Sequence, residues 1–184
     1  MNPSYLSSVK RQFAYYKSLA DKTLAQLTEK ELFWHYNEES NSVAILVKHV
    51  VGNMHSRWTN FLTEEGEKPW RNRDDEFINS YASKQEMLAA WEKGWGCLFE
   101  AIHSIHEEKL DTIVYIRNEG HTVTEAINRQ LCHYSYHIGQ LVFLGKMVKN
   151  SDWKSLSISK SDSKKYNAEK FNTQKGIRHF TEDL

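Results

Sequence analysis

Two of the nine histidines, His133 and His137, are spaced four residues apart in a stretch with helical periodicity. That spacing places both imidazole rings on one face of a helix, close enough for one metal ion to bind both. The same face carries Gln130 and Gln140 beside the apolar positions, so it borders the protein interior. Because unpaired buried polar groups cost about 1–3 kcal/mol each, this face needs polar partners. The pattern therefore indicates a site that another element completes.

His49 is the best candidate for a third ligand, because it lies with Asn53 beside the apolar positions of an earlier helical segment. In helical bundles, metal sites are built from inward-facing side chains on different helices. Three neutral imidazoles leave a fourth coordination position open, which is typical of catalytic rather than structural zinc sites. Asn53, Gln130 and Gln140 lie one turn from these ligands and could hold the imidazoles by hydrogen bonds. The alternative interpretation is a set of histidines satisfied within the core.

Three arginines, Arg57, Arg71 and Arg73, are candidates for binding a substrate. A guanidinium group binds a carboxylate through two parallel hydrogen bonds, so these residues could hold an acidic thiol or substrate. Arg71 and Arg73 lie in a long polar loop over residues 63–82, and long loops in compact domains are often functional. The alternative interpretation is pairing at the surface with the acidic residues at positions 74–76.

Four segments with apolar residues every three or four positions must position these side chains. They cover residues 6–27, Asn41 or Ser42 to about Leu62, Ser83 to Ile105, and Thr122 to about Val148. Ser83 and Thr122 are each followed three residues later by glutamate, which is the spacing of a capping box. The runs Thr112–Arg117 and His121–Val123, on either side of a glycine turn at Asn118–Gly120, indicate a small β-hairpin. We therefore expect an all-α protein, an antiparallel four-helix bundle with long connections and a short hairpin before the fourth helix.

The chain is expected to form a metal-binding bundle over residues 1–150 and a C-terminal extension over residues 151–184. Basic residues dominate this extension, and its aromatic residues Trp153, Tyr166 and Phe171 favour a tail packed on the same domain. Basic residues in such a tail could bind phosphates, although a solvated charged surface is the commoner case.

Composition limits the class of protein. With 184 residues, 40% hydrophobic and 26% charged, the chain has the size and make-up of one ordinary globular domain. Such a chain buries enough surface to fold without a structural metal, so a bound metal would be functional. Lysines and arginines equal aspartates and glutamates at 24 each, which argues against a nucleic-acid partner. With no long apolar run, we expect a cytoplasmic protein with no membrane partner and reduced thiols at Cys97 and Cys132.

Several stretches carry a more specific signal: Asn41–Ile45, Lys48–Met54, Ser56–Trp58, Gly66–Asp74, His133–Gln140 and Trp153–Ile158. In these stretches the sequence resembles the DinB-like, or YfiT-like, metalloenzyme superfamily, and within it a branch of small proteins common in bacilli and their relatives. The resemblance spans nearly the whole chain. It implies a four-helix bundle that binds one divalent metal ion, most readily zinc or nickel, through His49, His133 and His137.

The resemblance also implies a reaction class. Characterised relatives transfer a low-molecular-weight thiol such as bacillithiol to a small electrophile, and a divalent metal would keep that thiol as the nucleophilic thiolate. A second interpretation is a non-catalytic metal-binding bundle that acts in a stress response. A third, a nucleic-acid-associated factor, is suggested only by the basic tail and the family name, and the zero net charge weighs against it.

A homodimer is expected on two grounds. Related bundles commonly pair, and large aromatic residues are enriched at protein interfaces. The contacts between helices in a small bundle do not obviously need as many large aromatic residues as this chain has at Trp58, Trp91, Trp95 and Trp153.

Overall fold

The computed structural model describes residues 4–181, and this part of the chain is mostly helical. Its α-helices are α1 (Tyr5–Gln26), α2 (Glu29–Leu32), α3 (Val43–Trp58), α4 (Lys84–Ser104), α5 (Val123–Lys149) and α6 (Ser163–Phe171). Strands β1 (Ile113–Ile116) and β2 (Glu119–Thr122) form one antiparallel sheet, and η1 (Asp74–Phe77) is a short 3₁₀ helix in the loop after α3. Among residues 4–181, no helix is both long and apolar enough to cross a membrane.

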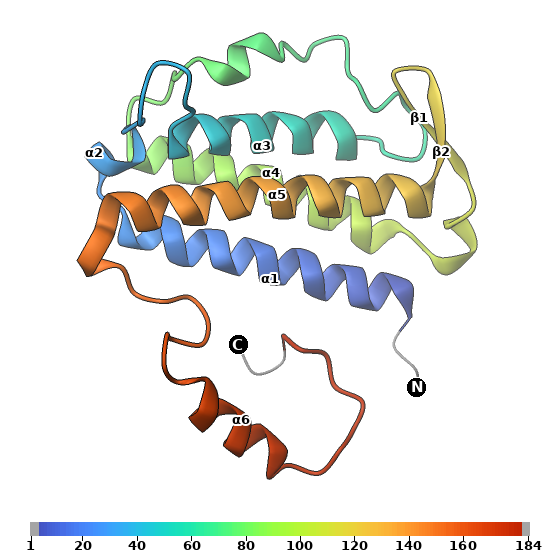
Figure 1. The fold of residues 1–184 in the computed structure, drawn as a ribbon. Coiled ribbons are helices and arrows are strands. Elements are labelled where there is room, and N and C mark those ends of the chain that lie inside the picture. Colours follow the sequence, from blue (N-terminus) through green and yellow to red (C-terminus); the bar gives the residue numbers. More distant parts are fainter. Residues whose placement is uncertain (1–3, 182–184) are drawn as a thin grey trace.

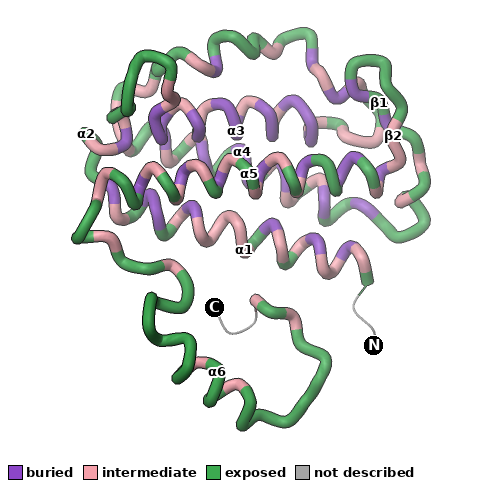
Figure 2. The backbone as a smooth tube through the Cα atoms, viewed as in Figure 1, coloured by how far each residue is buried: buried purple, intermediate pink, exposed green. Residues whose placement is uncertain are grey.

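The four longest helices, α1, α3, α4 and α5, lie side by side (Figure 1). α3 packs against α4, α1 packs against α5, and α3 also contacts α5 and η1. Figure 2 shows that the buried residues are concentrated along these helices. Phe13, Val47, Leu98 and Ile138, one from each long helix, are at most 1% exposed. The apolar stripes predicted from helical periodicity therefore form the core.

Three of the four tryptophans considered for an interface lie inside this core. Trp58, Trp91 and Trp95 are at most 2% exposed. The Trp58 indole nitrogen donates a hydrogen bond to the hydroxyl of Tyr134 at 3.0 Å, and Phe13 meets the Trp58 ring edge-on. The interpretation that these three tryptophans are available for a dimer interface is therefore wrong, because they are buried inside the single chain. The homodimer stays a prediction without that argument.

Side-chain caps begin the helices that carry the histidines. The hydroxyl of Ser42 accepts a hydrogen bond from the Ile45 backbone N–H at the start of α3, as predicted. Thr122 and Glu125 form the predicted capping box at the start of α5. α3 ends at Trp58 rather than near Leu62, because Thr59 is extended and Asn60 has a φ of 48°. That left-handed conformation, which asparagine tolerates, stops the helix.

The β-hairpin is present, but its turn begins one residue before the predicted segment Asn118–Gly120. Arg117 and Asn118 have φ values of 57° and 62°, which is the pattern of a type I′ turn. Gly120 instead pairs with Tyr115 inside the sheet. The backbone N–H groups of Arg117 and Asn118 donate to the carboxylate of Glu65 at 2.6 and 3.1 Å. Because this carboxylate holds the two amides, the turn forms without a glycine.

The C-terminal extension contacts the rest of the chain near its two ends. The Gln26 side chain bonds both backbone groups of Lys154, at 2.8 and 3.1 Å, and the ring of Phe180 meets Tyr15 edge-on. Between these contacts, α6 has no buried residue and stands apart from α1 (Figure 1). Phe171, expected to pack on the bundle, is 85% exposed, so that expectation is wrong for this residue.

Candidate metal centre

The three predicted histidines come together between α3 and α5. Nε2 of His133 lies 3.4 Å from Nε2 of His49 and 3.1 Å from Nε2 of His137. One ligand atom from each ring lies within 4.8 Å of the others. Nitrogens about 2.0–2.1 Å from a zinc ion at the corners of a tetrahedron would be about 3.3 Å apart. The cluster therefore has a geometry that could bind a metal ion, as the spacing predicted.

Hydrogen bonds on the far side of two rings orient the nitrogens. Nδ1 of His49 lies 2.9 Å from Oε2 of Glu76, and Nδ1 of His137 lies 3.3 Å from Oε1 of Gln140. Both oxygens are acceptors, so each Nδ1 carries the proton and each Nε2 presents its lone pair to the cluster. Nδ1 of His133 is buried without a hydrogen-bond partner. A proton on Nε2 of His133 can therefore be donated to either neighbouring Nε2 atom, whereas a cation bound by all three Nε2 atoms would use all three lone pairs.

The two histidines of α5 are neutral at physiological pH. Burial, and after it the charges of His137, His49, Arg57 and Arg71, lower the pKa of His133 to about 3. Burial and His49 lower the pKa of His137 to about 4. Because a neutral imidazole is the form that binds metals, both rings are available as ligands without losing a proton.

Glu76 belongs to the site, although the sequence pattern indicated only that it could pair with an arginine at the surface. It is 5% exposed, and Arg71 donates to its two oxygens at 2.7 and 2.9 Å. Burial acts to raise the pKa of Glu76, but its hydrogen bonds to His49 and Arg71 outweigh burial and lower it. A Cβ at Gly52 would lie 2.7 Å from Cδ of Glu76. A glycine three residues after His49, within a helix, was therefore the available signal of this close approach.

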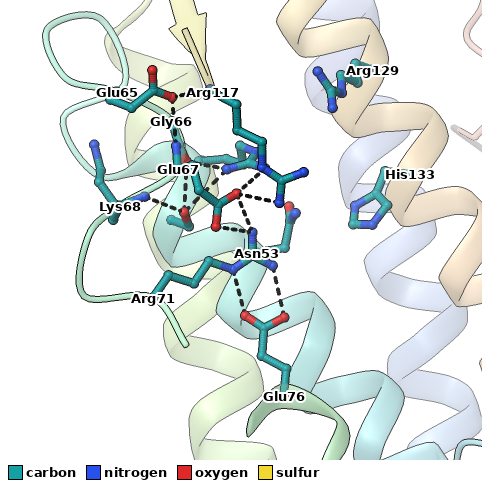
Figure 3. A network of polar contacts seen from close by, with 12 residues as sticks. Asn53, Glu65, Gly66, Glu67, Lys68, Arg71, Glu76, Arg117, Arg129 and His133 are labelled. Carbon is teal, nitrogen blue, oxygen red and sulfur yellow. Dashed lines mark hydrogen bonds and ion pairs between the residues drawn. The ribbon is translucent and has the colours of Figure 1, made fainter. Parts of the chain in front are cut away.

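Two of the predicted arginines belong to a buried ion-pair network (Figure 3). The Oε2 atom of Glu67 lies 2.9 Å from Nη2 of Arg57, 3.3 Å from Nη1 of Arg71 and 3.2 Å from Nη2 of Arg117. The alternative of pairing at positions 74–76 gave the right partner for Arg71, which pairs with Glu76, but this pair is buried rather than at the surface. It is wrong for Arg57, which pairs with Glu67 instead. The network fixes both guanidinium groups in place.

Arg73 lies elsewhere and is not part of this network. Its guanidinium lies over the Phe77 ring, 5.1 Å from the ring centroid. The same ring stacks on His49, at a centroid distance of 5.1 Å and an interplanar angle of 28°. Arg73 is therefore connected to the histidine cluster through Phe77 rather than through a carboxylate.

A cavity of about 680 Å³ lies over the cluster. It is lined by Asn41, His49, Asn53, Arg57, Arg71, Arg73, Phe77, Arg117, Arg129, Gln130, Cys132, His133, Tyr136, His137 and Gln140. All three histidines, all three predicted arginines and all three predicted amides thus share one cavity. Both cysteines are free, and Cys132 is exposed at this lining.

A family model described as "Protein of unknown function (DUF1572)" matches residues 1–162. The chain belongs to this family. The matched residues of this DUF1572 protein include the histidine cluster, Glu76 and the whole cavity lining, and they end directly before α6. No curated protein matches the sequence.

The predicted amides have different positions in this DUF1572 protein. Gln140 contacts His137, as expected of a residue that orients a ligand. Asn53 instead accepts a hydrogen bond from the hydroxyl of Tyr134 at 2.9 Å. Gln130 is 3% exposed, and its side-chain oxygen is buried without a partner. Of these three amides, only Gln140 forms a hydrogen bond to a ring of the cluster within the described part of the chain.

Proposed function

We propose that this DUF1572 protein is a divalent-metal-dependent enzyme of the DinB/YfiT type, built on an antiparallel four-helix bundle. The observation that carries the proposal is the convergence of three Nε2 atoms, from His49, His133 and His137, beneath an open cavity. Three ligands leave a coordination position for a substrate. When bound there, a zinc or nickel ion would keep a thiol sulfur deprotonated, which is its nucleophilic form.

The proposed reaction is transfer of a low-molecular-weight thiol, such as bacillithiol, to a small electrophile. The sulfur forms a bond to an electrophilic carbon, the leaving group departs with its electron pair, and the thiol proton passes to solvent. The resemblance of the histidine motifs to the DinB-like superfamily supports this reaction class. A polar cavity of about 680 Å³ has the size of a small-molecule site.

The protein's own residues supply orientation in this scheme. Glu76 holds the proton on Nδ1 of His49, and Arg71 fixes Glu76 through two hydrogen bonds. Gln140 does the same for His137. Such partners of metal-binding histidines typically change metal affinity or activity 10–100-fold when they are removed. The Arg71–Glu76–His49 chain is therefore the main positioning device of the proposed site.

The test combines metal analysis with an activity assay on the full-length protein. We expect about one zinc or nickel ion per chain, and loss of that ion in His49→Ala and in His133→Ala. His103→Ala, which removes an exposed histidine outside the cluster, is the matched control and should keep the ion. Bacillithiol transfer to a chloronitrobenzene should depend on the bound metal.

Two results would redirect the proposal. Full metal content in the His49→Ala, His133→Ala double variant would show that these histidines do not bind the metal. A full complement of metal without transfer to any of a panel of electrophiles would favour the alternative, a non-catalytic metal-binding bundle of the stress response.

A further inference from the structure

The cavity over the histidine cluster has an excess of positive charge. Its lining contains five arginines, Arg57, Arg71, Arg73, Arg117 and Arg129, and no carboxylate. Two glutamates behind the lining, Glu67 and Glu76, pair with three of these arginines. Two carboxylates thus face five guanidinium groups. A concave site lined by one sign of charge concentrates ligands of the opposite sign.

Two of these arginines have no carboxylate partner within residues 4–181. Arg73 lies over Phe77, and Arg129 approaches only Nε2 of His121, at 3.3 Å. Both residues are exposed at the cavity, so their donors are accessible to a ligand. The arginine fork matches a carboxylate through two parallel hydrogen bonds, and a lysine would not do so.

The two unpaired arginines lie on different elements that border the cluster. Arg129 is on α5, one turn before His133, and Figure 3 shows both side chains projecting from that helix. Arg73 directly precedes η1, where Phe77 stacks on His49. A ligand that reaches both arginines therefore extends across the histidines, with an acid group toward each element.

Two further polar groups of the lining lack partners. Oε1 of Gln130 and Nε of Arg57 are buried without a hydrogen bond, and both residues are about 95% buried or more. Neither atom is accessible at the cavity surface, so neither can bind a ligand in this arrangement. The arginines of the lining are therefore the groups that indicate the chemistry of the ligand.

We propose that the natural substrate is a small organic anion with two or more carboxylates, bound by Arg73 at one end and Arg129 at the other. This inference rests on the proposed function only for the location of the site, because the arginines, not a metal, bind the acid groups. Arg57 and Arg71, which the sequence suggested as substrate ligands, instead hold Glu67 and Glu76. Arg129 is a ligand that the sequence analysis did not select.

The test is isothermal titration of full-length, chelator-treated protein with propane-1,2,3-tricarboxylate, which has neither a thiol nor a hydroxyl group. We expect saturable binding to one site. Arg73→Gln and Arg129→Gln should each weaken it by about tenfold or more, since a hydrogen-bonded charged group contributes about 1.5–3 kcal/mol. Arg178→Gln, which removes the same charge from an exposed position outside the cavity, should change it little. Arg129→Lys should lie between Arg129→Gln and the wild type.

Three results would overturn the inference. These are absence of measurable tricarboxylate binding, an equal loss in Arg178→Gln, and tighter binding of inorganic phosphate or of propionate at the same arginines. Circular dichroism checks that each variant is folded. Metal content is measured on separate samples, so the two proposals fail separately. A protein that binds the tricarboxylate but no metal would contradict only the proposed function, and the reverse result would contradict only this inference.

Discussion

Glu76 accepts a hydrogen bond from Nδ1 of His49 at 2.9 Å, although the two residues are 27 positions apart in the sequence. The contact joins the loop after α3 to the face of α3 that borders the cavity. It defines which nitrogen of His49 carries the proton, and it leaves Nε2 directed at the other two histidines.

Replacement of Glu76 by glutamine should weaken zinc binding by about 10–100-fold, because the neutral amide removes the charge that supports His49. The measurement is a competition titration against a chromophoric chelator. Glu92→Gln is the control, since Glu92 pairs with Lys17 at an exposed position far along the chain. Equal zinc affinity in the Glu76 and Glu92 variants would show that the contact is not part of a metal site.

Alanine at Gly52 and alanine at Gly96 should have opposite effects on stability. At Gly96 an added methyl group meets nothing within 4 Å, so better helix propensity should stabilise the protein by about 0.5–1 kcal/mol. At Gly52 the methyl group collides with the Glu76 carboxylate, so both stability and zinc affinity should fall. Urea unfolding measures the first quantity for both variants, and the chelator titration measures the second. A stabilised Gly52→Ala variant with unchanged zinc affinity would contradict the geometry.

Removal of metal should leave the helices intact. The core residues of α1, α3, α4 and α5 are buried without help from the histidine cluster, so we expect an unchanged far-ultraviolet circular dichroism spectrum at 25 °C after chelation. The melting temperature should fall, because a ligand that binds only the folded state stabilises it. An unfolded metal-free protein would instead mark the site as structural.

The ion pairs of Glu67 should contribute stability that acid removes. Burial acts to raise its pKa, but the hydrogen bond to Arg57 and the charges of Arg71, Arg57 and Arg117 outweigh burial and lower it below 4.5. Its contribution is therefore fully present above about pH 4.5 and is lost as the pH falls through the lowered pKa. The difference in unfolding free energy between the wild type and Glu67→Gln should shrink below pH 4.5. A difference that stays constant from pH 7 to pH 3 would argue against these pairs.

A homodimer, if formed, should use the exposed face of α5. Tyr136, Phe143 and Met147 are 64%, 63% and 42% exposed and lie along that helix. Light scattering at micromolar concentration should give twice the 21.6 kDa chain mass. Phe143→Glu should give a monomer, whereas Phe171→Glu on α6 should not change the mass. A measured mass of one chain for the wild-type protein would show that the dimer prediction is wrong.

Local patterns predicted what depends on neighbouring residues in the sequence. The periodicity of the helices, the caps at Ser42 and Thr122, and the four-residue spacing of His133 and His137 are all properties of a single helix. These features could be read directly from the chain. The meeting of His49 with the other two histidines needed one further assumption, that the two helices face each other.

Features that depend on contacts between distant segments were missed or misplaced. Glu76 stands in an acidic run that is typical of a solvated surface, but it is buried by its hydrogen bonds to His49 and Arg71 and by its close approach to Gly52. The hairpin turn moved away from Gly120 because Glu65, from another segment, holds the amides of Arg117 and Asn118. In both cases a carboxylate from the loop after α3 overrode the local preference.

Two of the contacts that hold that loop lie at Gly66 and at Glu76. At Gly66 its backbone N–H donates to the carbonyl of Tyr115 in β1 at 2.8 Å, and its carbonyl accepts from Ser56 on α3. At Glu76 it is held by His49. We therefore expect the segment between these points to keep its length in homologues, because one inserted residue would carry the carboxylate away from its histidine. Insertions and deletions in homologues should accumulate at Asn79 and Ser80 instead, where the chain is exposed before α4.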